Sequence, residues 1–448
     1  MSIYVNRVLN LRKIKAIGFD MDHTLVKYKT NNFEKLTYKT LIERLVTQKK
    51  YPKKIRDLKF NIKKMSHGLM LDSLQGTIIK ISRFGKVKTA MRGGKILDYN
   101  TTQELYSNNI IDPKDKHIMP LNTSFAMAHG ILYADVIQLK IDGLKLPSYS
   151  QIAADIKDVL DEIHTDGSLK SEVKKNLGRF IIQDDKIVLL LETLKASKKK
   201  IFLITNSDYE YTKILLEYAI NPFIKNYKDW SELFDVVVTM AQKPEFFTEK
   251  GKILEIDKAT GFMKNVIRPI QNGVYQGGSG RIFEEDFSLK GEDILYLGDH
   301  IYGDVVRLKK KSGWRTGMVI ESLKTEIESL NKVKPIQEKI DTWMIKKRSL
   351  ENELNKLFSD KKKNSQKINI LFEKIESLDR SIQNEIKNYQ KHFNPYWGEL
   401  MRAGQEESFY ADLVQRYACI YMSSIADLLD YSTRTYFRPY RRLLAHEI

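Results

Sequence analysis

Two aspartates separated by one residue, Asp20 and Asp22, follow directly after the apolar run 14–19 (IKAIGF). In such a pair, one carboxylate can attack a phosphorus atom while the other donates a proton to the leaving oxygen and then helps to activate water. A DxD pair alone is common in loops, but DxDxT directly after a buried strand is a much more specific pattern. The pair therefore predicts a phosphoryl-transfer site in which one of Asp20 and Asp22 is the nucleophile and the other the acid and base.

A second polar cluster, Thr205-Asn206-Ser207, follows the apolar run 201–204 (IFLI). A hydroxyl group and backbone N–H groups at the start of a helix can bind an anion, although such a cluster can equally be a simple helix cap. Lys243, in the sequence AQKPEFF, can neutralise the charge of a phosphoryl group and of a nucleophile beside it. A lone lysine is most often a solvated surface residue, so this role depends on the other motifs.

A third acidic motif, GDHIYGD at 298–304, contains Asp299 and Asp304 and follows the apolar run 294–297. Carboxylates at the end of a strand suit Mg²⁺, which prefers oxygen ligands and keeps several water molecules. We therefore expect Asp299 to bind Mg²⁺ directly. Asp304 is expected to act through a water molecule or by orienting Lys243, and a Gly/Asp turn without a metal is the alternative.

Alternating strands and helices must position these motifs. Apolar runs that end in polar residues are typical of buried parallel strands, and their alternation with helical patterns predicts an open α/β sheet. In such a sheet, ligands bind beyond the carboxyl ends of the strands, where the candidate catalytic residues stand. The expected strands are 14–19, 201–204, 235–238, 294–297 and 315–320, and helices are expected at 186–195 and 209–220.

The interval between the first and second expected strands is far too long for one crossover connection. An inserted substructure is therefore expected there, with a helix at 152–163 and strand-like sequence at 76–87. A later region has apolar residues at helical spacing on both sides of the polar linker 359–366, which predicts an antiparallel helical hairpin. The expected parts are 1–28 (core), 29–180 (insertion), 181–321 (remaining core), 322–392 (hairpin) and 393–448 (an aromatic-rich segment packed on the core).

Composition excludes some classes of protein. The chain has 448 residues, of which 42% are hydrophobic, and a single cysteine, Cys419, so no intrachain disulfide framework can form. No secretory pattern and no apolar run of membrane-spanning length is found, so a soluble, cytoplasmic protein is expected. The net charge is +18, and the tract 49–64 is strongly basic. Such a tract is either a solvated surface or an attraction site for nucleotides or nucleic acid.

The four motifs, in this order, resemble those of the haloacid dehalogenase superfamily. The resemblance implies an α/β fold with a Rossmann-like parallel sheet core, an aspartyl-phosphate intermediate and Mg²⁺ as cofactor. In that superfamily the metal is bound by a carboxylate, a backbone carbonyl and a second carboxylate, here those of Asp20, Asp22 and Asp299. The insertion 29–180 corresponds to an α+β cap, which excludes water and selects the substrate, and the C-terminal part is a helical extension.

The amino-acid sequences in and around the motifs are also similar to those of the cytosolic purine 5′-nucleotidases that prefer IMP and GMP. The sequences DMDHTL, LITNSDYEYT, KPEFF, GDHIYGD, GWRT and HTDGSLK carry this resemblance, which spans most of the chain from about residue 10. It implies hydrolysis of purine nucleoside 5′-monophosphates, with transfer of the phosphate to a second nucleoside as a further activity. A homo-oligomer is expected, and neither a membrane nor nucleic acid is expected as a partner.

The resemblance also implies substrate contacts from the cap. Asp161 would accept a hydrogen bond from N1–H of a 6-oxopurine, and His164 and Phe125 would stack on opposite faces of the base. Lys170 would contact the phosphate. Because adenine has no N1–H donor, these residues would favour IMP and GMP over AMP.

Base selectivity is less firmly implied than the chemistry, because the chain departs from the family around the base. Lys157 stands where the family has an arginine, which removes bidentate geometry, and Ala126 and Thr165 replace an asparagine and a tyrosine. Two alternatives therefore stay open. One is a phosphatase of the same superfamily acting on another small phosphomonoester, and the other is a basic nucleic-acid-binding or scaffold protein.

Overall fold

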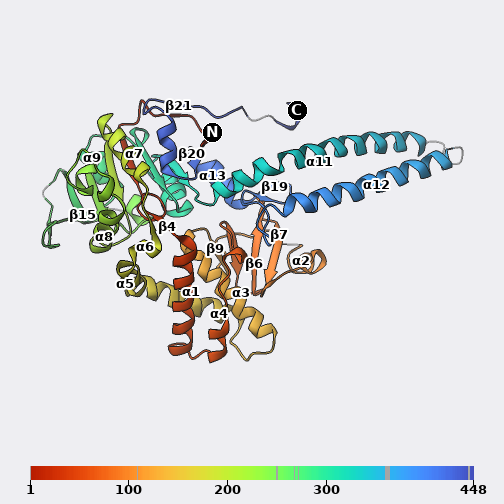
Figure 1. The fold of residues 1–448 in the computed structure, drawn as a ribbon, viewed down its shortest axis with the longest axis horizontal. Coiled ribbons are helices and arrows are strands. Elements are labelled where there is room, and N and C mark those ends of the chain that lie inside the picture. The colour runs from red at the N-terminus through yellow and green to blue at the C-terminus, as the bar shows by residue number, and fades with distance from the viewer. Residues whose placement is uncertain are drawn as a thin grey trace.

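The computed structural model describes residues 2–107, 109–248, 251–266, 268–270, 272–358, 364–441 and 444–447. Figure 1 shows three parts: an α/β body, a mixed cap beside it and a long two-helix arm that projects away from both. None of the described helices combines the length and the hydropathy that a membrane crossing requires.

A ten-stranded sheet forms the centre of the body, and seven of its neighbouring strands are parallel. The predicted α/β fold class is confirmed, and all five predicted strands are present. The other strands, from the two ends of the chain and from residues 253–277, complete both edges of the sheet. In sheet order the strands are β1 (Ile3–Val5), β20 (Ile420–Met422), β17 (Arg315–Val319), β16 (Ile294–Gly298), β3 (Ala16–Phe19), β11 (Lys200–Ile204), β12 (Val236–Thr239), β15 (Gly273–Gly277), β13 (Ile253–Ile256) and β14 (Met263–Asn265).

The parallel strands are buried because helices cover the sheet. Strands β3, β12 and β16 are buried along their whole length, which explains why their sequences are continuously apolar rather than alternating. The helices of the body are α7 (Asp185–Ala196), α8 (Tyr209–Ala219), α9 (Gly280–Asp286), α10 (Arg307–Lys311) and α13 (Phe409–Tyr417). A short π-helix, Ile301–Val306, directly precedes α10.

The insertion between β3 and β11 folds as a separate α+β cap (Figure 1). Strand β4 (Lys27–Tyr28) pairs with β10 (Ile181–Ile182), so the chain leaves and re-enters the body at one place. The cap sheet has the order β8-β7-β6-β5-β9 and is antiparallel. Its strands are β5 (Leu69–Asp72), β6 (Thr77–Ile81), β7 (Val87–Arg92), β8 (Lys95–Ile96) and β9 (Ile118–Leu121), and its helices are α1 (Thr30–Thr47), α2 (Tyr99–Tyr106), α3 (Met127–Ile141), α4 (Tyr149–Thr165), α5 (Ser168–Lys175) and α6 (Leu177–Phe180).

The basic tract 49–64 lies in the cap, where several of its charges are neutralised. Lys49 pairs with Asp155 and Asp158, at 3.4 and 3.0 Å. Arg56 pairs with Glu43, at 2.7 Å. These ion pairs make a solvated cap surface the simpler interpretation of the tract.

The arm consists of α11 (Leu323–Leu357) and α12 (Ser365–Gln390), which pack along each other. Part of the predicted linker, residues 359–363, lies outside the described residues. After the arm, β20 joins the central sheet beside β17, and β21 (Tyr436–Phe437) pairs with β2 (Leu9–Asn10). The C-terminal segment thus packs on the body, and Cys419 is fully buried within it.

Glu34 on α1 is fully buried and has an unusual environment. Its Oε2 accepts a hydrogen bond of 2.6 Å from the N–H of Ala128, at the start of α3, while Oε1 has no partner among the described residues. Burial raises the pKa of Glu34 to about 8. Because this folded-state pKa lies above the unfolded value, the protein loses stability as the pH rises from about 4.5 to about 8.

Glu34→Gln removes the charge that this site disfavours. We expect the unfolding free energy of the variant, relative to the natural chain, to be higher at pH 9 than at pH 5 by roughly 2–5 kcal/mol. Urea unfolding at the two pH values measures this difference, and Glu43→Gln, at an exposed position of the same helix, is the control. An equal effect of Glu34→Gln at both pH values would show that Glu34 titrates normally.

Candidate active site

Three adjacent parallel strands bring the motifs together at one edge of the sheet. Phe19 in β3 lies opposite Leu203 in β11 and Leu297 in β16. Asp20, Thr205 and Asp299 each come directly after one of these strands. Because the carboxyl ends of parallel strands share an edge, residues far apart in the sequence meet there.

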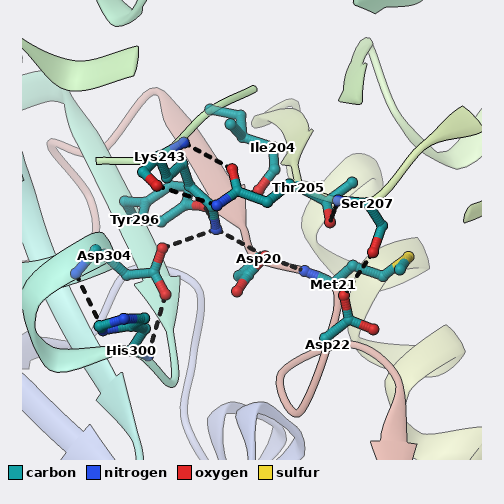
Figure 2. Close-up of polar contacts among 12 residues, drawn as sticks. Asp20, Met21, Asp22, Ile204, Thr205, Ser207, Lys243, Tyr296, His300 and Asp304 are labelled. Atoms are coloured by element: carbon teal, nitrogen blue, oxygen red, sulfur yellow. Dashed lines mark hydrogen bonds and ion pairs between the residues drawn. The ribbon is translucent and has the colours of Figure 1, made fainter. Parts of the chain in front are cut away.

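Asp20 lies at the centre of this site (Figure 2) and is 8% exposed. Its Oδ1 accepts a hydrogen bond of 2.7 Å from the N–H of Met21 and lies 2.7 Å from Nζ of Lys243. Burial raises the pKa of Asp20, Lys243 opposes the shift, and the charges of Asp304 and Asp22 add to it. The carboxylate of Asp20 is therefore fixed in orientation and shielded from water, and Lys243 alone does not balance the negative charges around it.

Lys243 is a buried ammonium group between two carboxylates. Its Nζ lies 2.7 Å from Oδ1 of Asp20 and 2.8 Å from Oδ1 of Asp304. Burial alone would lower the pKa of Lys243, but the charges of Asp20 and Asp304 outweigh burial and hold the pKa well above its ordinary value. Lys243 is therefore charged at neutral pH and is placed to neutralise an anion beside Asp20.

Two residues position Lys243. The side chain of Asn206 accepts a hydrogen bond of 2.6 Å from the backbone N–H of Lys243 and donates one of 3.0 Å to its carbonyl oxygen. The hydroxyl of Tyr296 accepts a hydrogen bond of 3.1 Å from Nζ and donates one of 2.9 Å to the carbonyl oxygen of Ile204. Asn206, which was expected to bind substrate, thus has its side chain engaged with the backbone of Lys243.

Sequence reasoning missed Tyr296, although two signals point to it. It is a hydroxyl-bearing residue inside an otherwise apolar strand, ILYLG. Gly18 in the neighbouring strand leaves room for its ring, because a Cβ at position 18 would come within 2.7 Å of the ring.

Three carboxylates form a cluster that can hold a cation. Asp20, Asp299 and Asp304 each offer an oxygen atom, and these atoms all lie within 4.8 Å of one another. Burial raises the pKa of Asp299 well above its ordinary value, and the charges of Asp20 and Asp304 raise it further. Lys243 supplies one positive charge against three crowded carboxylates, which leaves a repulsion that a further cation would relieve. An all-oxygen set suits a hard divalent cation.

Position 298, directly before Asp299, has room for glycine but not for a larger residue. A Cβ at Gly298 would come within 2.4 Å of Oδ2 of Asp304. The same Oδ2 accepts a hydrogen bond of 3.1 Å from the N–H of His300. The first glycine of the GDHIYGD motif, Gly298, therefore leaves room for the side chain of Asp304 to reach Lys243.

Asp22 is held apart from the cluster by two hydroxyl groups. Tyr28 donates a hydrogen bond of 2.6 Å to Oδ1, and Ser207 donates one of 3.0 Å to Oδ2. The hydroxyl of Tyr28 also lies 3.1 Å from that of Tyr211. Figure 2 shows the side chain of Asp22 turned toward Ser207 rather than toward Asp304. The side chain of Asp22 is therefore not part of the carboxylate cluster, and only its backbone could contribute there.

Thr205 is fully buried between these groups. Its Oγ1 accepts a hydrogen bond of 3.1 Å from the N–H of Ser207. The hydroxyl hydrogen can therefore point to an anion in front of Asp20. Of the predicted triplet, Thr205 fits an anion contact, Asn206 positions Lys243 and Ser207 orients Asp22.

Lys170 reaches the site from the cap. Its Nζ pairs with Oδ2 of Asp208, at 2.6 Å, and lies 5.2 Å from the centre of the Tyr211 ring. Asp208 caps α8 in the body, so this ion pair bridges the cap and the body. Lys170 thus lies over the ring of Tyr211, whose hydroxyl is next to that of Tyr28.

The predicted base-binding residues gather at the facing ends of two cap helices. Phe125, just before α3, and His164, near the end of α4, have ring centres 6.0 Å apart and planes at 73°. An edge-to-face pair at this spacing leaves no room for a base between the rings, so a sandwich would require them to separate and turn. Asp161 and Lys157, on the same face of α4, form an ion pair and are largely exposed.

Comparison with known proteins identifies relatives over nearly the whole chain. The sequence model described as the 5′ nucleotidase family matches residues 3–448. A 5′-nucleotidase domain-containing protein of Dictyostelium discoideum is 27% identical over 457 residues, which cover 99% of this chain and 74% of that protein.

Similarity to solved structures is weak. A predicted phosphoglycolate phosphatase from Haemophilus somnus 129PT is 12% identical, over 68% of this chain and 85% of that chain, with a TM-score of 0.31. An archaeal β-phosphoglucomutase from Pyrococcus sp. strain ST04 is 13% identical, over 68% and 86%, with a TM-score of 0.29. The assignment therefore depends on the family match, which confirms the resemblance to 5′-nucleotidases. Because that match includes every motif that converges on Asp20, the chain belongs to the 5′ nucleotidase family and is a phosphomonoester hydrolase.

Proposed function

We propose that this hydrolase is a Mg²⁺-dependent 5′-nucleotidase that converts purine nucleoside 5′-monophosphates, with IMP and GMP preferred, to nucleoside and phosphate. One observation carries the proposal: Asp20 faces both a buried ammonium group and two further carboxylates whose oxygens lie within 4.8 Å. This arrangement supplies a nucleophile, a charge-neutralising cation and a metal-binding set in one place. The cap residues discussed above support the choice of a purine base.

The phosphate would be held by groups from both parts of the molecule. Lys243 and Thr205 belong to the body, and Lys170 comes from the cap. Asp20, Asp299 and the backbone carbonyl of Asp22 would hold Mg²⁺, which when bound neutralises charge on the phosphate and on the nucleophile. These contacts would place the phosphorus atom in line with an oxygen of Asp20.

The reaction then proceeds in two displacements. A carboxylate oxygen of Asp20 attacks phosphorus, the bond to the nucleoside 5′-oxygen breaks, and Asp22 gives that oxygen its proton. Asp22, now ionised, takes a proton from a water molecule that attacks phosphorus and releases phosphate from Asp20. The hydrogen bonds from Tyr28 and Ser207 hold Asp22 in one orientation for both proton transfers. A nucleoside hydroxyl in place of water would give phosphotransferase activity.

A substrate panel tests the proposal. Phosphate release should be measured with IMP, GMP, AMP, CMP, p-nitrophenyl phosphate and glucose 6-phosphate, with and without Mg²⁺. We expect kcat/KM for IMP and GMP to exceed that for AMP and for the sugar phosphate by about tenfold or more. A sugar phosphate cleaved faster than every nucleotide would instead identify a phosphatase for another small phosphomonoester.

Asp161→Ala tests whether Asp161 recognises the purine base. Loss of the acceptor for N1–H should lower the ratio of kcat/KM for IMP to that for AMP by about tenfold. Asp158→Ala, which removes an exposed acid from the same helix, is the matched control and should leave this ratio unchanged. An IMP-to-AMP ratio that is the same in Asp161→Ala and the natural chain would exclude Asp161 from base recognition.

A further inference from the structure

His129 lies in the first turn of α3, four residues after Phe125, so the two side chains share one face of that segment. It is 6% exposed. No hydrogen-bonding atom in the described ranges is within reach of its Nε2, which is itself buried. A buried ring nitrogen without a partner is unfavourable, and in proteins such atoms are rarely left unpaired.

A half-buried histidine in the cap, His67, has partners for both ring nitrogens. Nε2 of His67 lies 3.2 Å from the hydroxyl of Ser124, and Nδ1 lies 3.2 Å from that of Ser322. Burial lowers the pKa of His67 to about 4, and it lowers that of His129 to about 4 as well. Both imidazoles are therefore neutral at pH 7, and they differ in that Nε2 of His129 has no partner among the described residues.

The surroundings of His129 are those of the candidate base site. Helix α3 packs against α4, and the charges of Asp161 and Lys157 on α4 act on the pKa of His129. Phe125, on its own side, contacts His164, which lies one turn after Asp161. The start of α3 and the end of α4 thus face each other, with His129 on one side and Asp161 on the other.

We propose that His129 is a specificity-determining residue whose Nε2–H donates a hydrogen bond to the 6-oxo oxygen of a bound hypoxanthine or guanine. This inference rests on the proposed nucleotidase function. The 6-oxo oxygen and N1–H are adjacent on the base edge, so His129 as donor and Asp161 as acceptor would read them together. Adenine reverses both positions, because it carries an amino donor at C6 and a lone pair at N1.

The neutral state of His129 suits this role. A neutral imidazole carries one N–H donor, and no described acceptor in the protein would occupy a proton carried on Nε2. Lys157 cannot substitute easily, because its side chain is 53% exposed and is paired with Asp161. Such an exposed ion pair between successive helical turns is weak, so Asp161 can leave Lys157 for the base at little cost.

His129→Leu and His129→Gln test the proposal. Leucine removes the donor at similar volume, whereas glutamine restores an N–H at similar reach. We expect His129→Leu to lower the IMP-to-AMP ratio of kcat/KM by about tenfold to a hundredfold, chiefly through KM for IMP. His129→Gln should recover most of the loss. All rates are referred to those with p-nitrophenyl phosphate, which has no base, so that general damage cancels.

His67→Leu is the matched control. It removes a half-buried histidine whose partners are protein hydroxyl groups, so it should reduce thermal stability without changing the IMP-to-AMP ratio. Circular dichroism establishes that each variant is folded. If His129→Leu does not fold, ¹⁵N-histidine spectra of the full chain carrying Asp20→Asn replace it: IMP should shift the His129 Nε2–H resonance, and AMP should not.

The outcomes distinguish the role of His129 from the proposed substrate class. A natural chain that prefers IMP, together with an unchanged ratio in folded His129→Leu or an unshifted Nε2–H resonance, overturns the role of His129 alone. A natural chain without preference for 6-oxopurines overturns the proposed substrate class and this role together.

Discussion

Asp20→Asn is expected to lower kcat for IMP on the order of 10⁴- to 10⁶-fold at saturating Mg²⁺. A carboxamide cannot form the acyl phosphate, and the remaining groups only bind and polarise the substrate. Because Asn keeps the size of Asp20 and can still accept the hydrogen bond from Met21, the fold should survive. Phosphate release in long incubations at high enzyme concentration measures the residual rate.

Two controls make the Asp20 result specific. Calorimetric titration should show that the Asp20→Asn protein still binds IMP, since Lys243, Thr205 and the cap contacts remain. Asp158→Asn, at an exposed site of α4, should retain full turnover. A rate within tenfold of that of the natural chain would mean that another group attacks phosphorus, and the two-displacement mechanism would be wrong.

Asp299→Asn is expected to raise the Mg²⁺ concentration for half-maximal activity by about tenfold to a hundredfold. The substitution removes one negative ligand from the cluster that Asp20 and Asp304 complete, and hard divalent cations bind through the charge and number of such oxygens. Removal of divalent cations by EDTA should abolish turnover of the natural chain, and added Mg²⁺ should restore it.

A readout independent of turnover comes from stability. Mg²⁺ that binds only the folded chain raises its melting temperature, so the natural chain should show a Mg²⁺-dependent increase that Asp299→Asn lacks. Asp293→Asn is the matched control, because Asp293 lies at the opposite end of the same strand, β16, where it pairs with Lys15 at 3.2 Å. Full activity after EDTA treatment, or an equal Mg²⁺ response in Asp299→Asn, would exclude this cluster as the metal site.

Much of the body could be predicted because its signals are local. The apolar runs that became β3, β11 and β16 are buried on both faces, so they are continuous in the sequence and end where the chain meets solvent and ligand. Asp20 and Asp299 stand at such ends, and the parallel register places them together once the strands pair. The residue types at these ends therefore indicated both the edge of the sheet and its chemistry.

Pairings between distant short segments could not be predicted in this way. Strand β20 has three residues, and in the central sheet it pairs with β17 on one side and with β1 on the other. The hairpin β13–β14 at the other edge is partly exposed and carries no strong apolar pattern. Such strands are stabilised by neighbours that lie far along the chain, which periodicity within a short window does not record.

By itself, the amino-acid sequence determined the fold class and the family and located the acidic motifs, because each depends on residue types in short windows next to strand ends. Only the tertiary structure decided which polar atoms are left for a ligand. In the folded chain the side chain of Asn206 hydrogen-bonds to the backbone of Lys243, and Ser207 donates to Asp22, whereas Nε2 of His129 has no partner among the described residues. The physical reason is that hydrogen bonding and burial are properties of surroundings, and here those surroundings are assembled from strands and helices far apart in the chain.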